Sequence, residues 1–183
     1  MRLRRAVPQP DLQPTLVGPR IVVRPVAPTD WDEMFAAAAD PGVWALHPVH
    51  DRYLAPVFRE FFESALACRS AFSFVDRQTS KVVGSSRYHG YDPAAREIEI
   101  GWTFLARDYW GGSYNAEVKK LMLDHAFGFV DTVVFWVGET NWRSQRAMEK
   151  IGGLRRDGLF ARTLNGAVRQ HVIFEIRRDR RIV

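Results

Sequence analysis

The chain has 183 residues, 46% hydrophobic and 26% charged, which is typical of a folded globular domain and argues against a disordered chain. No apolar run approaches the roughly 20 residues that a membrane helix needs, and no apolar segment follows the basic N-terminus as a secretory signal requires. Cys68 is the only cysteine, which excludes an intrachain disulfide and favours a reducing compartment. We therefore expect a cytoplasmic protein without a membrane span.

The net charge of +5 raises the question of nucleic-acid binding, but the charge lies at the two ends. Arg2, Arg4 and Arg5 contribute three positive charges and the segment 177–181 another net three, so the residues between carry −1. Basic ends are usually solvated. The charge therefore does not favour a nucleic-acid partner, and phosphate contact by the tails stays an alternative.

The first half of the chain predicts an arm followed by mixed strands and helices. Residues 1–15 are rich in proline and have no period, which indicates an extended or disordered arm before a single domain over 16–183. The expected elements are a strand over 21–26, a helix from a Thr29-Asp30 cap to about Ala39, a loop over 41–53, a helix over 55–69, and strands over 71–75 and 81–88.

The second half has a more specific order. Its expected elements are a strand over 97–105, a glycine turn over 108–113, an amphipathic helix, a strand over 132–138, a helix within 141–152, and strands over 159–164 and 168–176. The last two strands flank Asn165-Gly166, a dipeptide typical of a two-residue hairpin turn. Together these elements predict one α/β domain with a mixed sheet and a C-terminal β-hairpin.

The glycine turn and the helix after it suggest a phosphate-binding site. A helix that begins after such a turn presents unpaired backbone N–H groups at the positive end of its dipole. Helical spacing places one group of residues on an apolar stripe: Tyr114, Val118, Leu121, Met122, His125, Ala126 and Phe129. The same spacing places Lys119, Lys120 and Asp124 elsewhere, so the helix is expected to pack on the sheet with its N-terminus at a groove.

The central strand alternates polar and apolar residues. Period two places Glu97, Glu99, Gly101 and Thr103 on one face and Ile98, Ile100, Trp102 and Phe104 on the other. Gly101 lies in mid-strand, where glycine often indicates a bulge or a close backbone approach.

These parts, in this order, resemble the GNAT superfamily, the GCN5-related N-acetyltransferases, over roughly residues 16–176. The residues that carry the resemblance are Leu16-Val17-Gly18, Val23-Arg24-Pro25-Val26, Asp30, Trp110-Gly111-Gly112-Ser113-Tyr114-Asn115, Asn141, Ser144, Lys150 and Gly152. Within the superfamily, the branch with ribosomal-protein alanine N-acetyltransferases is the most similar. Ser113 and Asn115 depart from the small residues of the first motif, and a serine at a positive-φ position costs about 1–2 kcal/mol.

The resemblance implies a fold and a cosubstrate. The fold is the acyl-CoA N-acyltransferase fold, a mixed sheet whose central strands splay to hold acetyl-CoA. The residues implied in cosubstrate binding are Thr103, Phe104, Leu105, Trp110, Gly111, Gly112, Ser113, Tyr114, Asn115, Asn141 and Ser144.

The resemblance also implies a reaction, transfer of acetyl directly to a primary amine, of a protein N-terminus or a small molecule, in a ternary complex. Glu99 is similar to the frequent general base, with a surface or ion-paired carboxylate as its alternative. Met148 occupies the position of the usual tyrosine acid and cannot donate a proton. Ser144 is the substitute in that branch, with a helix-surface or cosubstrate-contact serine as its alternative.

The acceptor side is less defined. Trp44, His47 and Tyr88 are candidates for contact with the amine, although loop histidines and core aromatics are the alternatives. His47 and His50 lack further ligands at metal-binding spacing, so no metal is expected. Expected partners are acetyl-CoA and the amine, with a homodimer as a further hypothesis. The alternative function is a non-catalytic acyl-CoA-binding or nucleic-acid-associated domain that uses the basic tails.

Overall fold

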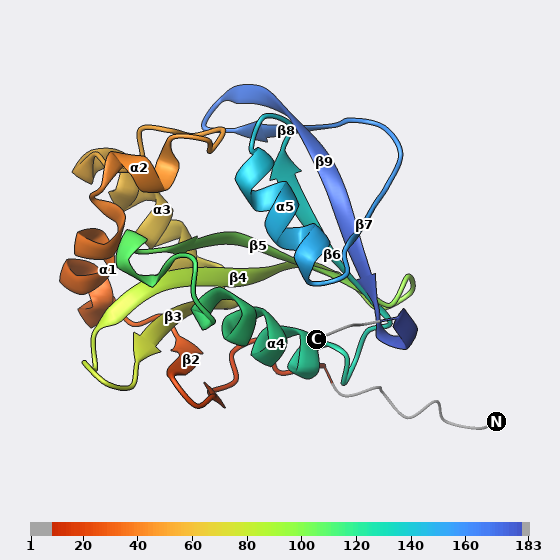
Figure 1. Ribbon diagram of the computed structural model, residues 1–183, viewed down its shortest axis with the longest axis horizontal. Coiled ribbons are helices and arrows are strands. Elements are labelled where there is room, and N and C mark those ends of the chain that lie inside the picture. The colour runs from red at the N-terminus through yellow and green to blue at the C-terminus, as the bar shows by residue number, and fades with distance from the viewer. Residues whose placement is uncertain (1–8, 181–183) are drawn as a thin grey trace.

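The structure, a computed structural model, describes residues 9–180 and has one mixed sheet with helices on both faces (Figure 1). Its strands are β1 (Leu16–Val17), β2 (Ile21–Pro25), β3 (Ala71–Asp76), β4 (Val82–Asp92), β5 (Glu97–Leu105), β6 (Thr132–Gly138), β7 (Leu154–Arg155), β8 (Phe160–Leu164) and β9 (Ala167–Arg177). Its α-helices are α1 (Trp31–Ala38), α2 (Pro41–Trp44), α3 (Ala55–Ala67), α4 (Tyr114–Ala126) and α5 (Trp142–Lys150). Short 3-10 helices span Pro28–Asp30, Arg107–Tyr109 and Arg178–Arg180.

The sheet has the order β1-β2-β3-β4-β5-β6-β9-β7, and β8 pairs with β9. Among residues 9–180 the only parallel pair is β5 with β6, and it is registered only from Glu97↔Thr132 to Glu99↔Val134. Beyond Glu99 the two strands separate, so the middle of the sheet is open at one end. This confirms the expected mixed sheet with splayed central strands. The predicted hairpin is also confirmed, since Asn165 and Gly166 have φ of 48° and 75° between β8 and β9.

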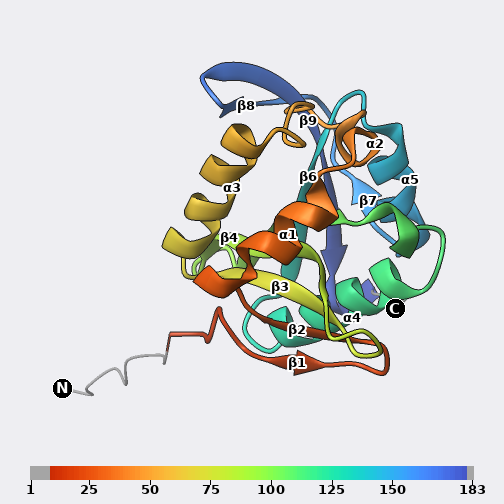
Figure 2. The same cartoon turned by 90° about the vertical axis from the view of Figure 1, so that its left-hand side faces the viewer.

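Two hydrophobic cores lie on opposite faces of the sheet. Figure 2 shows the helices that cover the sheet. Helices α4 and α5 cover one face, where Met122 and Met148 pack against strand residues such as Phe135. Helices α1, α2 and α3 cover the other face, and α3 buries Phe58, Phe61, Phe62 and Ala65 at the spacing of one helical stripe. None of the helices within residues 9–180 is long and apolar enough to cross a membrane.

The expected arm lies partly outside the described residues, as do Arg2, Arg4 and Arg5 of the basic N-terminus. Residues 9–15 form no helix or strand, but Leu12 packs against the core beneath α4. The Asp11 carbonyl also lies 2.7 Å from Nε2 of His125, so this segment is attached to the domain.

One expectation for the N-terminal third is wrong and another is confirmed only in position. The segment 41–53 is not all loop, because the Asp40 carboxylate accepts from the Gly42 N–H at 2.7 Å and Pro41 starts the short helix α2. Asp30 is the N-cap residue of α1, but its carboxylate makes no cap hydrogen bond to that helix. The carboxylate instead accepts from the Arg24 guanidinium at 2.7 and 2.8 Å, from the Ser73 hydroxyl at 2.6 Å and from the Ala27 N–H at 2.9 Å.

The expected alternation of β5 is wrong beyond Gly101. The register with β4 shifts there by one residue, and Trp102 has a φ of 53°, so β5 contains a bulge. After the bulge Phe104 packs in the core under α1–α3, and Leu105 in the core under α4. Thr103 consequently lies toward α4 and not on the face of Glu99. The glycine in mid-strand indicated this bulge, but not its effect on the later residues.

Candidate functional site

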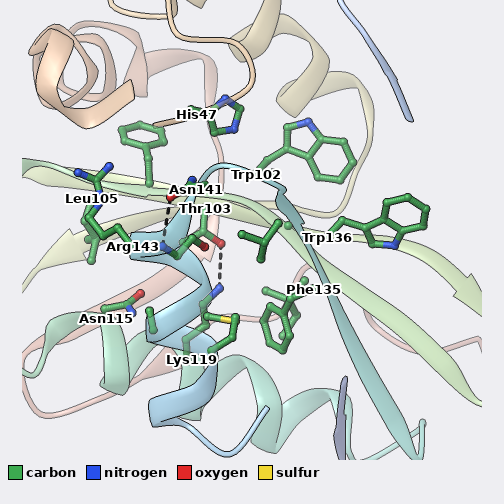
Figure 3. Close-up of a pocket in the computed structure, with 18 of the residues that line it drawn as sticks. His47, Trp102, Thr103, Leu105, Asn115, Lys119, Phe135, Trp136, Asn141 and Arg143 are labelled. Atoms are coloured by element: carbon green, nitrogen blue, oxygen red, sulfur yellow. Dashed lines mark hydrogen bonds between the residues drawn. The ribbon is translucent and has the colours of Figure 1, made fainter. Parts of the chain in front are cut away.

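A cavity of about 630 Å³ occupies the open end of the sheet. Its walls come from β5 and β6 where they separate, from the N-terminal turn of α4, from α5, from the segment of α2 and the residues after it, and from the β8–β9 hairpin. In Figure 3 Thr103 lies near the centre, with Lys119 below it, Asn115 and Arg143 at the left, His47 above, and Trp102 and Trp136 at the right.

The turn before α4 leaves backbone donors without intrahelical partners. The first backbone bond of the helix runs from the Glu117 N–H to the Ser113 carbonyl at 2.9 Å. The N–H groups before Glu117 therefore have no partner within the helix. Gly111 has a φ of 72°, whereas Ser113 has a φ of −82°. The left-handed position thus falls on a glycine, and the serine carries no backbone strain.

The predicted turn residues separate into two groups. Trp110, Gly111, Gly112 and Asn115 line the cavity. The Trp110 indole N–H donates to the Leu105 carbonyl at 2.8 Å, which ties the turn to the end of β5. Ser113 and Tyr114 do not contribute to the wall. The Tyr114 hydroxyl donates to Asp76 at 3.3 Å, so the Tyr114 side chain points away from the cavity. Only the backbone groups of Ser113 and Tyr114 remain as candidate contacts with a ligand.

Three cations also line the cavity, of which only Lys150 was named in the sequence motif. Arg143, Arg146 and Lys150, all on α5, line the cavity. The Arg143 guanidinium stacks 4.1 Å from the Trp110 ring centroid and donates to the Val43 carbonyl at 3.1 Å. Together with the free N–H groups of α4, these charges make this end of the cavity suited to a phosphate-bearing ligand.

The predicted α5 motif residues lie on the same wall. The Asn141 side-chain oxygen accepts from the Ser144 N–H at 3.1 Å and caps α5. Both residues line the cavity, as does Met148, which is buried. The structure therefore brings Ser144 to the cavity and places no phenol at position 148.

Glu99 lines the cavity from the opposite side of the sheet. It is buried, and its two oxygens accept from the Arg162 guanidinium at 2.8 and 2.7 Å. A Cβ atom at Gly101 would lie 2.8 Å from Oε1 of Glu99, so a larger residue there would require the carboxylate to shift. Glu97 is farther from the cavity and pairs with Arg156. Glu99 is thus an ion-paired carboxylate inside the candidate site, with lone pairs left on both oxygens.

Lys119 is a buried lysine that the sequence interpretation placed off the packed stripe. Its side chain is 3% exposed, and Nζ donates to Oγ1 of Thr103 at 2.9 Å and lies 4.9 Å from the Phe135 ring centroid. Burial lowers the pKa of Lys119 to about 7. Its spacing of four from Asn115 and three from Ala116, which both line the cavity, was the available signal.

The three acceptor candidates have different places. Trp44 lines the cavity and is buried, and its indole N–H donates to the Ala38 carbonyl at 2.7 Å. His47 also lines the cavity, and burial and the nearby Arg52 lower its pKa well below the usual value. Tyr88 is not at the cavity. It is fully buried under α4, where its hydroxyl donates to the Met122 carbonyl at 2.6 Å.

No group of three histidine, cysteine or carboxylate side chains within residues 9–180 is arranged to hold a metal ion. The charges that line the cavity are mostly positive, which suits an anionic organic ligand.

Comparisons with known proteins agree with this architecture. A family model described as an acetyltransferase (GNAT) domain matches residues 20–153, whereas no curated protein matches the chain. A GCN5-related N-acetyltransferase from Brucella melitensis has a TM-score of 0.81 and 21% identity, covering 96% of this chain and 84% of its own. An acetyltransferase from Agrobacterium tumefaciens has a TM-score of 0.68 and 24% identity, covering 97% and 99%. A structure from Vibrio cholerae, provisionally described as a ribosomal-protein-serine acetyltransferase, has a TM-score of 0.73 and 15% identity, covering 89% and 97%. At these identities the likeness shows a common fold.

Proposed function

Because this chain belongs to the GNAT acetyltransferase family, we propose that it transfers an acetyl group from acetyl-CoA directly to a primary amine. The observation that most supports the proposal is one continuous cavity. It joins the turn before α4, whose backbone N–H groups have no partner within the helix, to the open edge of β5 and the carboxylate of Glu99. The cosubstrate supplies a thioester as an activated acetyl donor.

The residues present fit acetyl-CoA. Backbone N–H groups of residues 111–115 and the cations Arg143, Arg146 and Lys150 suit its phosphates. Thr103 to Leu105 lie past the last registered pair of β5 with β6, so their backbone can hold the pantetheine arm. Asn141 and Ser144 face the same space from α5.

One proton transfer and one hydrogen bond are assigned to side chains of this chain. Glu99 accepts the proton that the amine loses on attack, directly or through water. Ser144 donates a hydrogen bond to the departing thiolate, which needs only weak assistance because a thiolate is a fair leaving group. No side chain forms a covalent intermediate in this scheme.

Calorimetric titration with acetyl-CoA tests the cosubstrate directly. We expect acetyl-CoA and CoA to bind at micromolar level and ATP to bind much more weakly, because ATP lacks the pantetheine arm that the β5 edge accommodates. Binding without thiol release in the presence of any amine would favour a non-catalytic acyl-CoA-binding domain. Failure of both CoA ligands to bind would contradict the proposal.

Replacement of Ser144 by alanine tests the proposed hydrogen bond from its hydroxyl to the departing thiolate. We expect Ser144→Ala to lower kcat roughly 10- to 100-fold, the range for a hydrogen bond to a charged group, while KM for acetyl-CoA changes less than about twofold. Thiol release at varied acetyl-CoA and saturating amine measures both constants. Ser144→Thr keeps the hydroxyl and is the matched control, with most of kcat retained. A raised KM for acetyl-CoA with an unchanged kcat would make Ser144 a cosubstrate contact only.

A further inference from the structure

Arg52 is a buried cation at the acceptor side of the cavity. Its side chain is 4% exposed, and it lies in the segment between α2 and α3. The guanidinium lies over the rings of Trp44 and Phe61, 5.5 and 4.9 Å from their centroids. It lines the main cavity and also a smaller adjoining cavity of about 130 Å³ between α3 and the β8–β9 hairpin. A guanidinium held in this way is fixed in position and faces the open space.

The partner that orients Arg52 is neutral. Nη1 of Arg52 lies 3.2 Å from Nε2 of His47. The other ring nitrogen, Nδ1, accepts from the Val49 N–H at 3.0 Å and lies 3.2 Å from the Val49 carbonyl oxygen, so the imidazole is held from both sides. The pKa of His47 is lowered well below its usual value by burial and by Arg52. The imidazole therefore holds the guanidinium without compensating its charge.

No carboxylate compensates Arg52 either. Within residues 9–180 it takes part in none of the ion pairs. Glu99 is already paired with Arg162, and Glu60 at the smaller cavity is exposed and not paired with Arg52. Nearby Asp51 affects Arg52 only at longer range.

A second buried arginine increases this positive charge. The Arg87 guanidinium lies 5.3 Å from the Phe61 ring centroid and 4.9 Å from that of Trp102, and it donates to the Ser64 hydroxyl at 3.2 Å and the Phe61 carbonyl at 3.5 Å. It forms no ion pair within residues 9–180, and Glu99 attracts it only at longer range. Burial and repulsion from Arg87 lower the pKa of Arg52 to about 10, which leaves Arg52 charged at neutral pH. A buried charge without a counter-ion is costly, so this region favours an anion.

We propose that the acceptor is a small amine that carries a carboxylate close to its nitrogen, as an amino acid does, and that Arg52 binds this carboxylate. This proposal rests on the proposed function. A planar guanidinium matches a carboxylate with two parallel N–H donors. Because Arg52 is buried, only a carboxylate that enters the cavity can reach it. This favours a small molecule over a side chain on the surface of a folded protein.

Paired acceptors test the proposal on the unmodified protein. Thiol release at saturating acetyl-CoA is measured with amino acids, with their carboxamides, and with uncharged tripeptide amides that have a free N-terminus. We expect kcat/KM for at least one amino acid to exceed that of its carboxamide by roughly 10- to 100-fold, the range for a charged hydrogen bond. Equal use of acid and amide, or a preference for the tripeptide amides, would overturn the proposal.

Substitution of Arg52 assigns the preference to its guanidinium. Arg52→Gln should raise KM for the amino acid about 10- to 100-fold and leave KM for the carboxamide and for acetyl-CoA within about twofold. Arg52→Lys should restore part of the preference. Arg59→Gln is the control, because Arg59 is exposed on α3 and stacks on Trp31 outside the cavity. Equal losses on acid and amide after Arg52→Gln would contradict the assignment.

The two proposals can fail separately. A protein that binds acetyl-CoA but acetylates neither member of any pair contradicts the carboxylate assignment and leaves cosubstrate binding intact. A protein that does not bind acetyl-CoA contradicts the proposed function itself.

Discussion

Glutamine at position 99 is expected to reduce kcat/KM by about 10²- to 10⁴-fold, the usual contribution of general acid–base catalysis. The amide keeps the shape of the carboxylate but cannot take a proton from the attacking amine. The shape of the acidic limb of the pH profile should also change, because a carboxylate can be protonated and an amide cannot, while the part of that limb caused by protonation of the amine remains. Thiol release with the best amine, measured across pH at saturating acetyl-CoA, gives both results.

Arg162 complicates this experiment and also supplies its control. Its guanidinium binds both oxygens of Glu99 and lies 4.1 Å from the Trp136 ring centroid. Loss of the ion pair between Glu99 and Arg162 therefore disturbs the wall of the cavity formed by the β8–β9 hairpin, even where no proton transfer is lost. Arg162→Gln breaks the pair but leaves the carboxylate in place, and it should retain the acidic limb. An equal loss in both variants with an unaltered pH profile would make Glu99 a residue that positions the hairpin.

Methionine at position 119 is expected to stabilise the protein. Lys119 has a pKa of about 7 in the fold, whereas an unfolded lysine has a pKa of about 10.4. Between these values the unfolded chain binds one proton more, so the unfolding free energy of the wild type rises with pH by up to about 1.4 kcal/mol per unit. Below pH 7 the full penalty applies. The Met variant lacks this penalty and should be about 4 kcal/mol more stable at pH 7, with the difference shrinking toward pH 10.

Denaturant unfolding at pH 6, 7.5 and 9 measures this difference. Lys120→Met is the matched control, because Lys120 is the neighbouring residue on α4, is exposed and pairs with Asp124. That variant should change the stability little and without a pH trend. A Lys119→Met protein that is less stable than the wild type, or whose stability gain is the same at every pH, would contradict a buried lysine with a lowered pKa.

Local sequence patterns were enough to predict the elements that frame the site. The bounds of β5 and β6 agree with the expected ranges 97–105 and 132–138, because β-branched and aromatic residues fill both strands. The hairpin at Asn165-Gly166 is confirmed for a similar reason, since its turn needs two positive φ angles.

The remaining site features depend on contacts that no local pattern encodes. The bulge after Gly101 reverses the faces of Thr103 and Phe104, and the one-residue shift that it causes is set by the pairing of β5 with β4. Lys119 and Arg52 were missed because buried cations look like surface residues in a sequence. Tyr88 was selected for its aromatic character, whereas its place under α4 follows from the strand pairing.

The division of the cavity between separate chain segments has an evolutionary consequence. One contiguous stretch, from Gly101 to Ile151, forms the side proposed for acetyl-CoA, while the segment 43–52 and the β8–β9 hairpin form the opposite side. A mutation in either of these outer segments, except at Arg162, which binds Glu99, changes one wall and leaves the side proposed for acetyl-CoA in place. We therefore expect descendants of this chain to acquire new amine specificities by drift in residues 43–52 and 163–171, with Glu99, Arg162 and Ser144 inherited unchanged.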